Sequence, residues 1–170
     1  MWLAIALAAA PGPTCRTADR RVESVITAKV RQAGGAESCQ SRLYHTVDDL
    51  DGDGRDDFVL VFDVEAPAGG NDSVQYLAVF PSSTRWRPSV VEVGERGERF
   101  VDEIEVEDGR TIVLLTSEYA AGDPMCCPSG DGELRYRLEH GRVVPVPDEP
   151  APRKLTRSSP KAHPPDRVSR

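Results

Sequence analysis

An aspartate-rich loop that runs directly into an apolar segment constrains this chain more than any other feature. From Asp48 to Asp57 the sequence reads DDLDGDGRDD, which places six aspartates in ten residues. Residues 58–64, FVLVFDV, then have the nearly unbroken apolar and β-branched character of a buried strand. An EF-hand would need a helix here and a glutamate at the twelfth loop position, which is Leu60 in this chain. We therefore predict a β-hairpin with an acidic loop.

The spacing of the loop aspartates predicts a calcium site. Asp49, Asp51 and Asp53 occupy the first, third and fifth positions of a calcium loop, and the backbone carbonyl of Arg55 stands at the seventh. The stretch resembles the calcium loop of FG-GAP and related strand-loop-strand repeats, which implies that Asp57, at the ninth position, completes the shell of ligands. The alternative is a solvated acidic turn that holds no ion.

Turn signals divide the remaining chain into one helix and about eight short strands. The apolar residues of 17–33 recur at helical spacing and are followed by two glycines, which predicts an amphipathic helix. Alternating or apolar runs separated by Gly, Pro and Asp-Gly turns predict the strands. Their expected ranges are 42–47, 57–64, 73–80, 86–93, 99–107, 111–117, 133–138 and 143–146. The expected fold class is α+β, with the helix packed on an antiparallel sheet of six to eight strands.

The charge of the chain is distributed unevenly. The net charge is −7, but residues 147–170 contain six Lys or Arg against three acids, so the preceding 146 residues carry −10. Half of the 14 prolines lie between Pro145 and Pro165. This composition predicts a disordered basic tail over 147–170, after a single domain over 15–146. An acidic domain also argues against a nucleic-acid partner, because phosphate binding requires a basic face.

The N-terminal segment predicts export. Residues 2–10, WLAIALAAA, have the length of a signal-peptide core and end in small residues, so we assign 1–10 as a signal peptide. The run is too short to cross a bilayer, which requires about 20 residues. The alternative is an N-terminal helix or strand that is buried in the fold. Export would place the protein in the periplasm or outside the cell.

Four cysteines, Cys15, Cys39, Cys126 and Cys127, suit an exported chain with disulfide bonds. Cys15 and Cys39 flank the predicted helix and form a natural pair, whose closure would contribute about 3 kcal/mol. For the adjacent Cys126 and Cys127, three interpretations remain open. They bond to each other, they pair separately with Cys15 and Cys39, or they serve as thiolates for a soft metal such as copper.

A second resemblance covers residues 40–146. The acidic loop, the Glu-Asp-Gly hairpin at 107–109 and the GDPMCCP block at 122–128 occur in an order similar to that of small exported bacterial proteins, including the LppP/LprE-type lipoproteins. The resemblance implies an envelope location and no particular reaction. This chain lacks the lipid-attachment pattern before Cys15.

No catalytic motif stands out. Glu103, Glu105 and Glu107 alternate with apolar residues, which is typical of the solvated face of a strand. We therefore predict a non-enzymatic envelope protein, stabilised by calcium and disulfides, that binds a protein, a glycan or another envelope component. The alternative is a thiol-redox or copper-handling protein that uses Cys126 and Cys127.

Overall fold

The computed structural model describes residues 19–47, 49–65, 72–83, 85 and 87–147. The predicted signal peptide, Cys15 and the basic tail from residue 148 onward lie outside these ranges. Within them the chain forms one helix and eight strands. Their bounds are α1 Arg20–Ala33, β1 Ala36–Val47, β2 Asp57–Glu65, β3 Ser73–Phe80, β4 Ser89–Glu95, β5 Arg99–Glu107, β6 Thr111–Glu118, β7 Gly130–Glu139 and β8 Arg142–Pro145.

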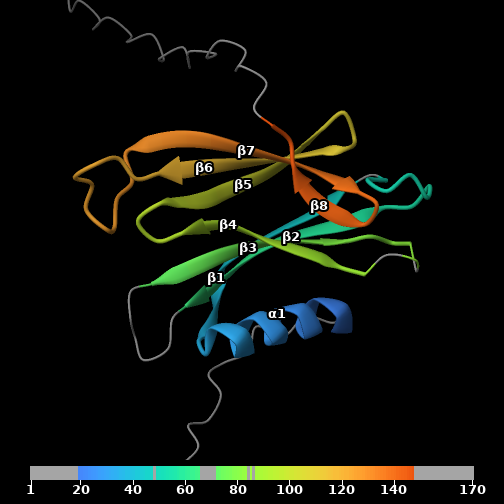
Figure 1. The fold of residues 1–170 in the computed structure, drawn as a ribbon, viewed down its shortest axis with the longest axis horizontal. Coiled ribbons are helices and arrows are strands. Elements are labelled where there is room, and N and C mark those ends of the chain that lie inside the picture. Colours follow the sequence, from blue (N-terminus) through green and yellow to red (C-terminus); the bar gives the residue numbers. More distant parts are fainter. Residues whose placement is uncertain (1–18, 48, 66–71, 84, 86, 148–170) are drawn as a thin grey trace, which may run out of the picture.

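The α+β class is confirmed, but the strands form two sheets where one was expected. All pairings are antiparallel between consecutive strands, in the orders β1-β2-β3-β4 and β5-β6-β7-β8. The two sheets pack face to face, and α1 covers the outer face of the first sheet (Figure 1).

The division falls at the turn between β4 and β5. The N–H of Arg96 still donates to the carbonyl of Ser73, the first residue of β3, 3.0 Å away, whereas the Glu98 carbonyl accepts the N–H of Tyr119, which follows β6. At Gly94 a Cβ atom would lie 2.8 Å from the Arg99 carbonyl oxygen, so only glycine permits this close approach. The chain thus leaves one sheet and enters the other within three residues. A hairpin turn would have the same length in sequence, which is why one sheet was expected.

Strand β2 explains the unbroken apolar run. Val59 and Val61 point into the core between the two sheets, and Leu60, Phe62 and Val64 point into a second core beneath α1. A strand that is covered on both faces has no solvent-facing position, so its sequence does not alternate. The predicted pairing of β1 with β2 is confirmed by the register Val47↔Asp57.

The helix begins three residues later than expected because Asp19 is its N-cap. The Asp19 carboxylate accepts the Arg21 N–H at 2.7 Å, and Gly34 ends the helix in the left-handed region with φ of 70°. On the buried side, Val22 and Ile26 pack against β2 and β3. Strand β1 begins six residues earlier than predicted, and it leaves its register with β2 between Ser38 and Leu43.

Candidate functional site

The acidic loop between β1 and β2 is folded by its own carboxylates. Asp49 accepts the N–H groups of Asp53 and Gly54 on its two oxygens, each at 2.7 Å. Asp51 Oδ1 also accepts the Asp53 N–H, at 3.1 Å. Gly52 and Gly54 have φ near +80°, which is a conformation that side chains with a Cβ rarely adopt. The loop is therefore a tight turn held by aspartate oxygens.

Asp57, the first residue of β2, anchors the loop to the sandwich. Its side chain is only 2% exposed. Oδ2 accepts the N–H groups of Leu50 and Asp51 at 2.8 and 3.2 Å, and Oδ1 accepts the Ser82 N–H at 2.7 Å. One buried carboxylate thus joins the start of the loop to the connection that follows β3.

Three of the predicted ligands converge. Asp49, Asp51 and Asp57 each place a carboxylate oxygen within 4.8 Å of the other two. Oδ2 of Asp51 is buried and has no hydrogen-bond partner among the described residues. Burial raises the pKa of the Asp51 carboxyl, and the nearby charges of Asp57 and Asp53 raise it further. A cation at this point would remove both the repulsion and the missing bond, so the cluster has the chemistry of a metal site.

The pKa of Asp49 moves in the opposite direction. Burial acts to raise it, but donation from the backbone N–H groups of Gly54, Asp53 and Gly52 outweighs that effect and lowers the pKa. The loop therefore holds Asp49 in its charged form.

Asp53 does not belong to this group of three carboxylates. Both oxygens of Asp53 accept the Ser82 hydroxyl, at 3.0 and 3.1 Å, and Oδ1 accepts the Arg55 N–H at 3.0 Å. The carboxylate of Asp53 thus links the loop to the β3–β4 connection through Ser82. The backbone carbonyl of Arg55 stays a predicted ligand. The part played by Ser82 could not be foreseen, because it lies 29 residues from Asp53 and belongs to no motif.

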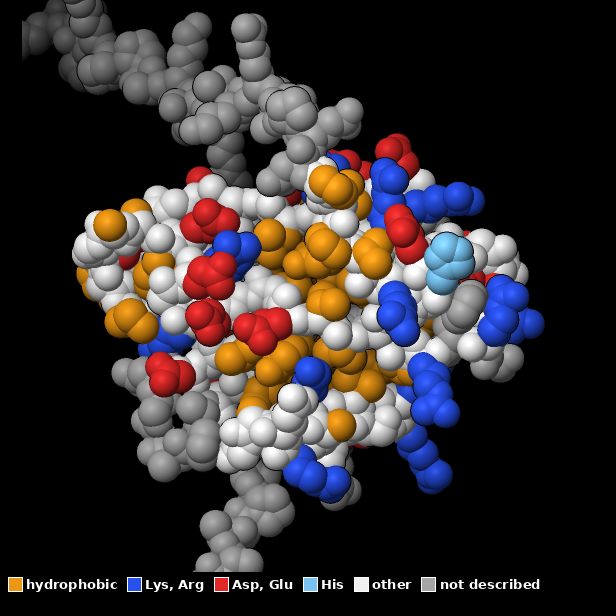
Figure 2. Space-filling model, viewed as in Figure 1, with side chains coloured by type: hydrophobic (Ala, Val, Ile, Leu, Met, Phe, Trp, Pro, Cys, Tyr) orange, Lys and Arg blue, Asp and Glu red, His pale blue; other side chains and the backbone are white. Residues whose placement is uncertain are grey.

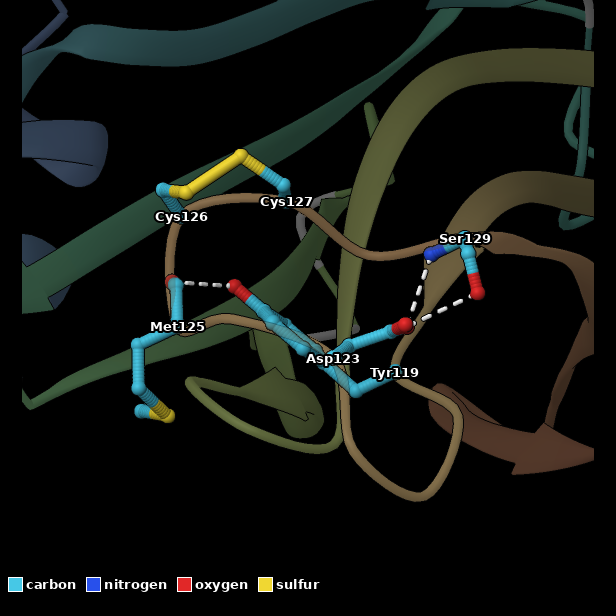
Figure 3. The surroundings of a disulfide bond; sticks show 6 residues. All are labelled: Tyr119, Asp123, Met125, Cys126, Cys127 and Ser129. Atoms are coloured by element: carbon cyan, nitrogen blue, oxygen red, sulfur yellow. Dashed lines mark hydrogen bonds between the residues drawn. A yellow bond between two sulfur atoms is a disulfide. The ribbon is translucent and has the colours of Figure 1, made fainter.

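At the opposite end of the sandwich, the GDPMCCP block forms a loop between β6 and β7 (Figures 1 and 3). Cys126 and Cys127 are bonded to each other, which is the first of the three predicted arrangements, and both residues are exposed. Cys39 is also disulfide-bonded. Because Cys15 lies outside the described residues, the Cys15–Cys39 bridge stays a prediction.

The disulfide loop is organised by Asp123 and Tyr119. Asp123 Oδ2 accepts the N–H groups of Ala120 and Ser129 and the Ser129 hydroxyl, at 2.8, 2.9 and 3.0 Å. The Tyr119 hydroxyl donates to the Met125 carbonyl at 2.7 Å, as Figure 3 shows. Donation from Ala120 is the largest influence on Asp123; together with that from Ser129, it outweighs burial and lowers the pKa of this carboxyl.

The alternating glutamates of β5 are exposed, as predicted. Glu107 forms a two-point ion pair with Arg135 of β7, at 2.6 and 3.0 Å, and this contact lowers the pKa of Glu107. Within the described ranges, no helix has the length and apolar character needed to cross a membrane. Comparison of the chain with protein-family models, with curated proteins and with solved structures gives no match.

We expect Asp57→Asn to lower the free energy of unfolding by about 2–3 kcal/mol, because a carboxamide has one acceptor oxygen where three N–H groups need partners. Urea unfolding followed by circular dichroism, in the presence of a chelator, measures this effect without any bound metal. Asp56→Asn removes the same charge from the exposed neighbouring residue and should change stability by less than about 0.5 kcal/mol. Equal effects of the two substitutions would contradict the role of Asp57.

We expect the Asp123 carboxyl to titrate below its ordinary pKa of 3.8. Because the pKa of Asp123 is lower in the folded protein than in the unfolded chain, the ionised carboxylate stabilises the folded loop at pH values above its ordinary pKa. This stabilisation is lost as the pH falls through the folded-state pKa. An NMR pH titration of the carboxyl carbon measures the inflection directly. In Asp123→Asn, the amide protons of Ala120 and Ser129 should exchange faster with solvent. An inflection at or above 3.8 would disprove the arrangement.

Proposed function

We propose that this protein is a calcium-stabilised, disulfide-bonded binding module that acts outside the cytoplasm and has no catalytic role. The observation that carries the calcium assignment is the convergence of Asp49, Asp51 and Asp57 around a buried oxygen that has no hydrogen-bond donor among the described residues. Such an arrangement is unfavourable without a cation, because like charges and an unpaired buried acceptor both cost free energy.

The donor set favours calcium over other cations. Among the described residues the cluster consists of three aspartates without His or Cys; carboxylate oxygens suit hard cations, whereas copper and zinc sites usually include imidazole or thiolate ligands. Ca²⁺ accepts 6–8 oxygen ligands in irregular geometry, so backbone carbonyls and water would complete the shell around three carboxylates. Extracellular calcium modules operate at dissociation constants of about 10⁻⁴–10⁻³ M, which an exposed loop of this kind can reach.

Location outside the cytoplasm is supported by the apolar run at residues 2–10 and by the disulfides at Cys39 and Cys126–Cys127. Disulfides persist in oxidising compartments and are rare in the cytosol. A binding role is supported by the grooves at the two ends of the sandwich, which are lined by Asp, Glu and Arg and whose described linings contain no His or Cys. The partner classes are a protein, a glycan or another envelope component.

We expect about 10 mM Ca²⁺ to raise the free energy of unfolding by roughly 1.4–2.7 kcal/mol, which follows from dissociation constants of about 10⁻³ and 10⁻⁴ M. Urea unfolding with and without the ion measures the shift, and calorimetric titration measures the affinity. Asp51→Asn should abolish the response, because Asp51 provides the unpaired oxygen. Asp56→Asn should retain it. A protein that Ca²⁺ does not stabilise, or an Asp51→Asn variant that binds equally well, would exclude the calcium site.

A second candidate function rests on the exposure of the Cys126–Cys127 disulfide. Reduction by an external thiol would transfer two electrons and two protons and produce two adjacent thiols, which are soft ligands suited to copper. We expect a structural disulfide instead. Alkylation of the exported protein without reductant should then leave both cysteines unmodified, and mild reduction should expose them. Two alkylated thiols before reduction, located by peptide mapping, would favour the redox function.

A further inference from the structure

A groove of about 840 Å³ opens at the end of the sandwich that carries the disulfide loop. Ser38 and Leu43, between which β1 departs from its register with β2, both line it. Pro128, next to Cys127, forms part of the wall. The calcium loop lies at the other end of the molecule (Figure 1).

The lining of this groove is predominantly acidic. Among the described residues that line it, four carboxylates stand against one cationic group, Arg96. The carboxylates are Asp63, Glu65, Asp72 and Asp102. Figure 2 shows further acidic side chains gathered toward the same end of the visible face, whereas Lys and Arg gather toward the opposite end. The resulting field attracts cationic ligands to the groove.

The groove carboxylates are spread out, in contrast to those of the calcium loop. Among the described residues, only Asp49, Asp51 and Asp57 bring three such ligand atoms within 4.8 Å of one another. A metal ion needs its ligands around one centre, whereas an extended organic cation can use carboxylates that are farther apart. The lining therefore suits an ammonium or guanidinium group on a longer ligand.

Two buried polar side chains occupy positions where the sandwich core would be apolar. Asp63 and Gln75 face each other across β2 and β3, in the rows that continue Val61 and Leu77. They are 6% and 3% exposed. Both residues line the groove, so the inner face of the sheet is polar at this end of the sandwich.

The groove also contains hydrogen-bond donors that lack partners among the described residues. Gln75 Oε1 accepts the Val101 N–H at 2.6 Å, which leaves its carboxamide nitrogen as a donor within the groove. Arg96 Nε is buried and has no hydrogen-bond partner. Both donors match a carbonyl oxygen, which a simple amine does not possess.

From these features we infer that the groove binds an extended basic peptide. A Lys or Arg side chain of the peptide lies among the carboxylates, and an adjacent backbone carbonyl accepts from Gln75 and Arg96. The inference rests on the proposed binding function and names its ligand class. It also assigns a role to the disulfide loop, since Asp123 and the Cys126–Cys127 bond hold the wall at Pro128 in one conformation.

The test uses the full chain and three capped tripeptides, acetyl-Ala-Xaa-Ala-amide with Xaa as lysine, norleucine or glutamate. Heteronuclear NMR titration measures each affinity from the shifts of Gln75, Val101 and Ser117. We expect the lysine peptide to bind at least about tenfold more tightly than the norleucine peptide, because only lysine supplies the charge, and the glutamate peptide not to bind. Equal affinities, or shifts outside the groove only, would overturn the inference.

Variants locate the contact. Asp63→Asn, which preserves shape, and Glu65→Gln, at an exposed position, should each weaken lysine-peptide binding by about fivefold or more. Glu105→Gln removes one charge from the solvated face of β5 and should leave the affinity unchanged. If all three variants bind like the parent protein, the groove is not the site.

The two proposals fail separately. The titration is repeated with a calcium chelator, and we expect peptide binding to persist because the calcium loop lies at the opposite end. Peptide binding without any calcium response would overturn the calcium assignment alone. A calcium response without peptide binding would overturn the groove assignment alone. Binding of Ca²⁺ at the groove, seen as displacement of the peptide, would contradict the peptide assignment.

Discussion

Burial of β2 on both of its faces is the constraint on which the rest of the structure depends. Val59 and Val61 join the core between the sheets, while Leu60 and Phe62 join the core under α1. Each layer therefore buries apolar surface that the other layers would otherwise leave in water. For a body of roughly 130 residues, two such cores that share one strand bury more side chains than one sheet and one helix could.

The same strand organises the polar chemistry at its two ends. Asp57 begins β2 and fixes the acidic loop through three backbone N–H groups. Asp63, close to the other end, places a carboxylate in the groove beside the disulfide loop. The apolar segment between them separates the two aspartates, so the proposed cation site and the proposed peptide groove lie toward opposite ends of one strand.

The acidic loop shows two different environments for a buried carboxylate oxygen. Asp57 receives N–H donors on both oxygens, which compensates for its loss of water. Among the described residues, Asp51 has an oxygen without such a donor and lies among like charges, which gives the loop the chemistry of a cation site. Two aspartates of the same ten-residue motif thus differ: the backbone satisfies Asp57, whereas Asp51 keeps an oxygen available for the proposed cation.

The sequence by itself determined the local features of this protein. Helical spacing over 17–33, the apolar run at 58–64 and the turn signals predicted the helix and most strands, because side-chain periodicity and turn chemistry act over a few residues. The spacing of the loop predicted Asp49 and Asp51 as ligands, and the resemblance to FG-GAP-type loops implied Asp57; the same spacing also included Asp53, which does not join the carboxylate cluster. Only the tertiary structure decided that the turn at 96–98 divides the strands into two sheets. It also decided that the Ser82 hydroxyl donates a hydrogen bond to Asp53, and that Asp63, Gln75 and Arg96 line one groove. These contacts join residues far apart in sequence, and their formation depends on how the sheets pack, which no local pattern encodes.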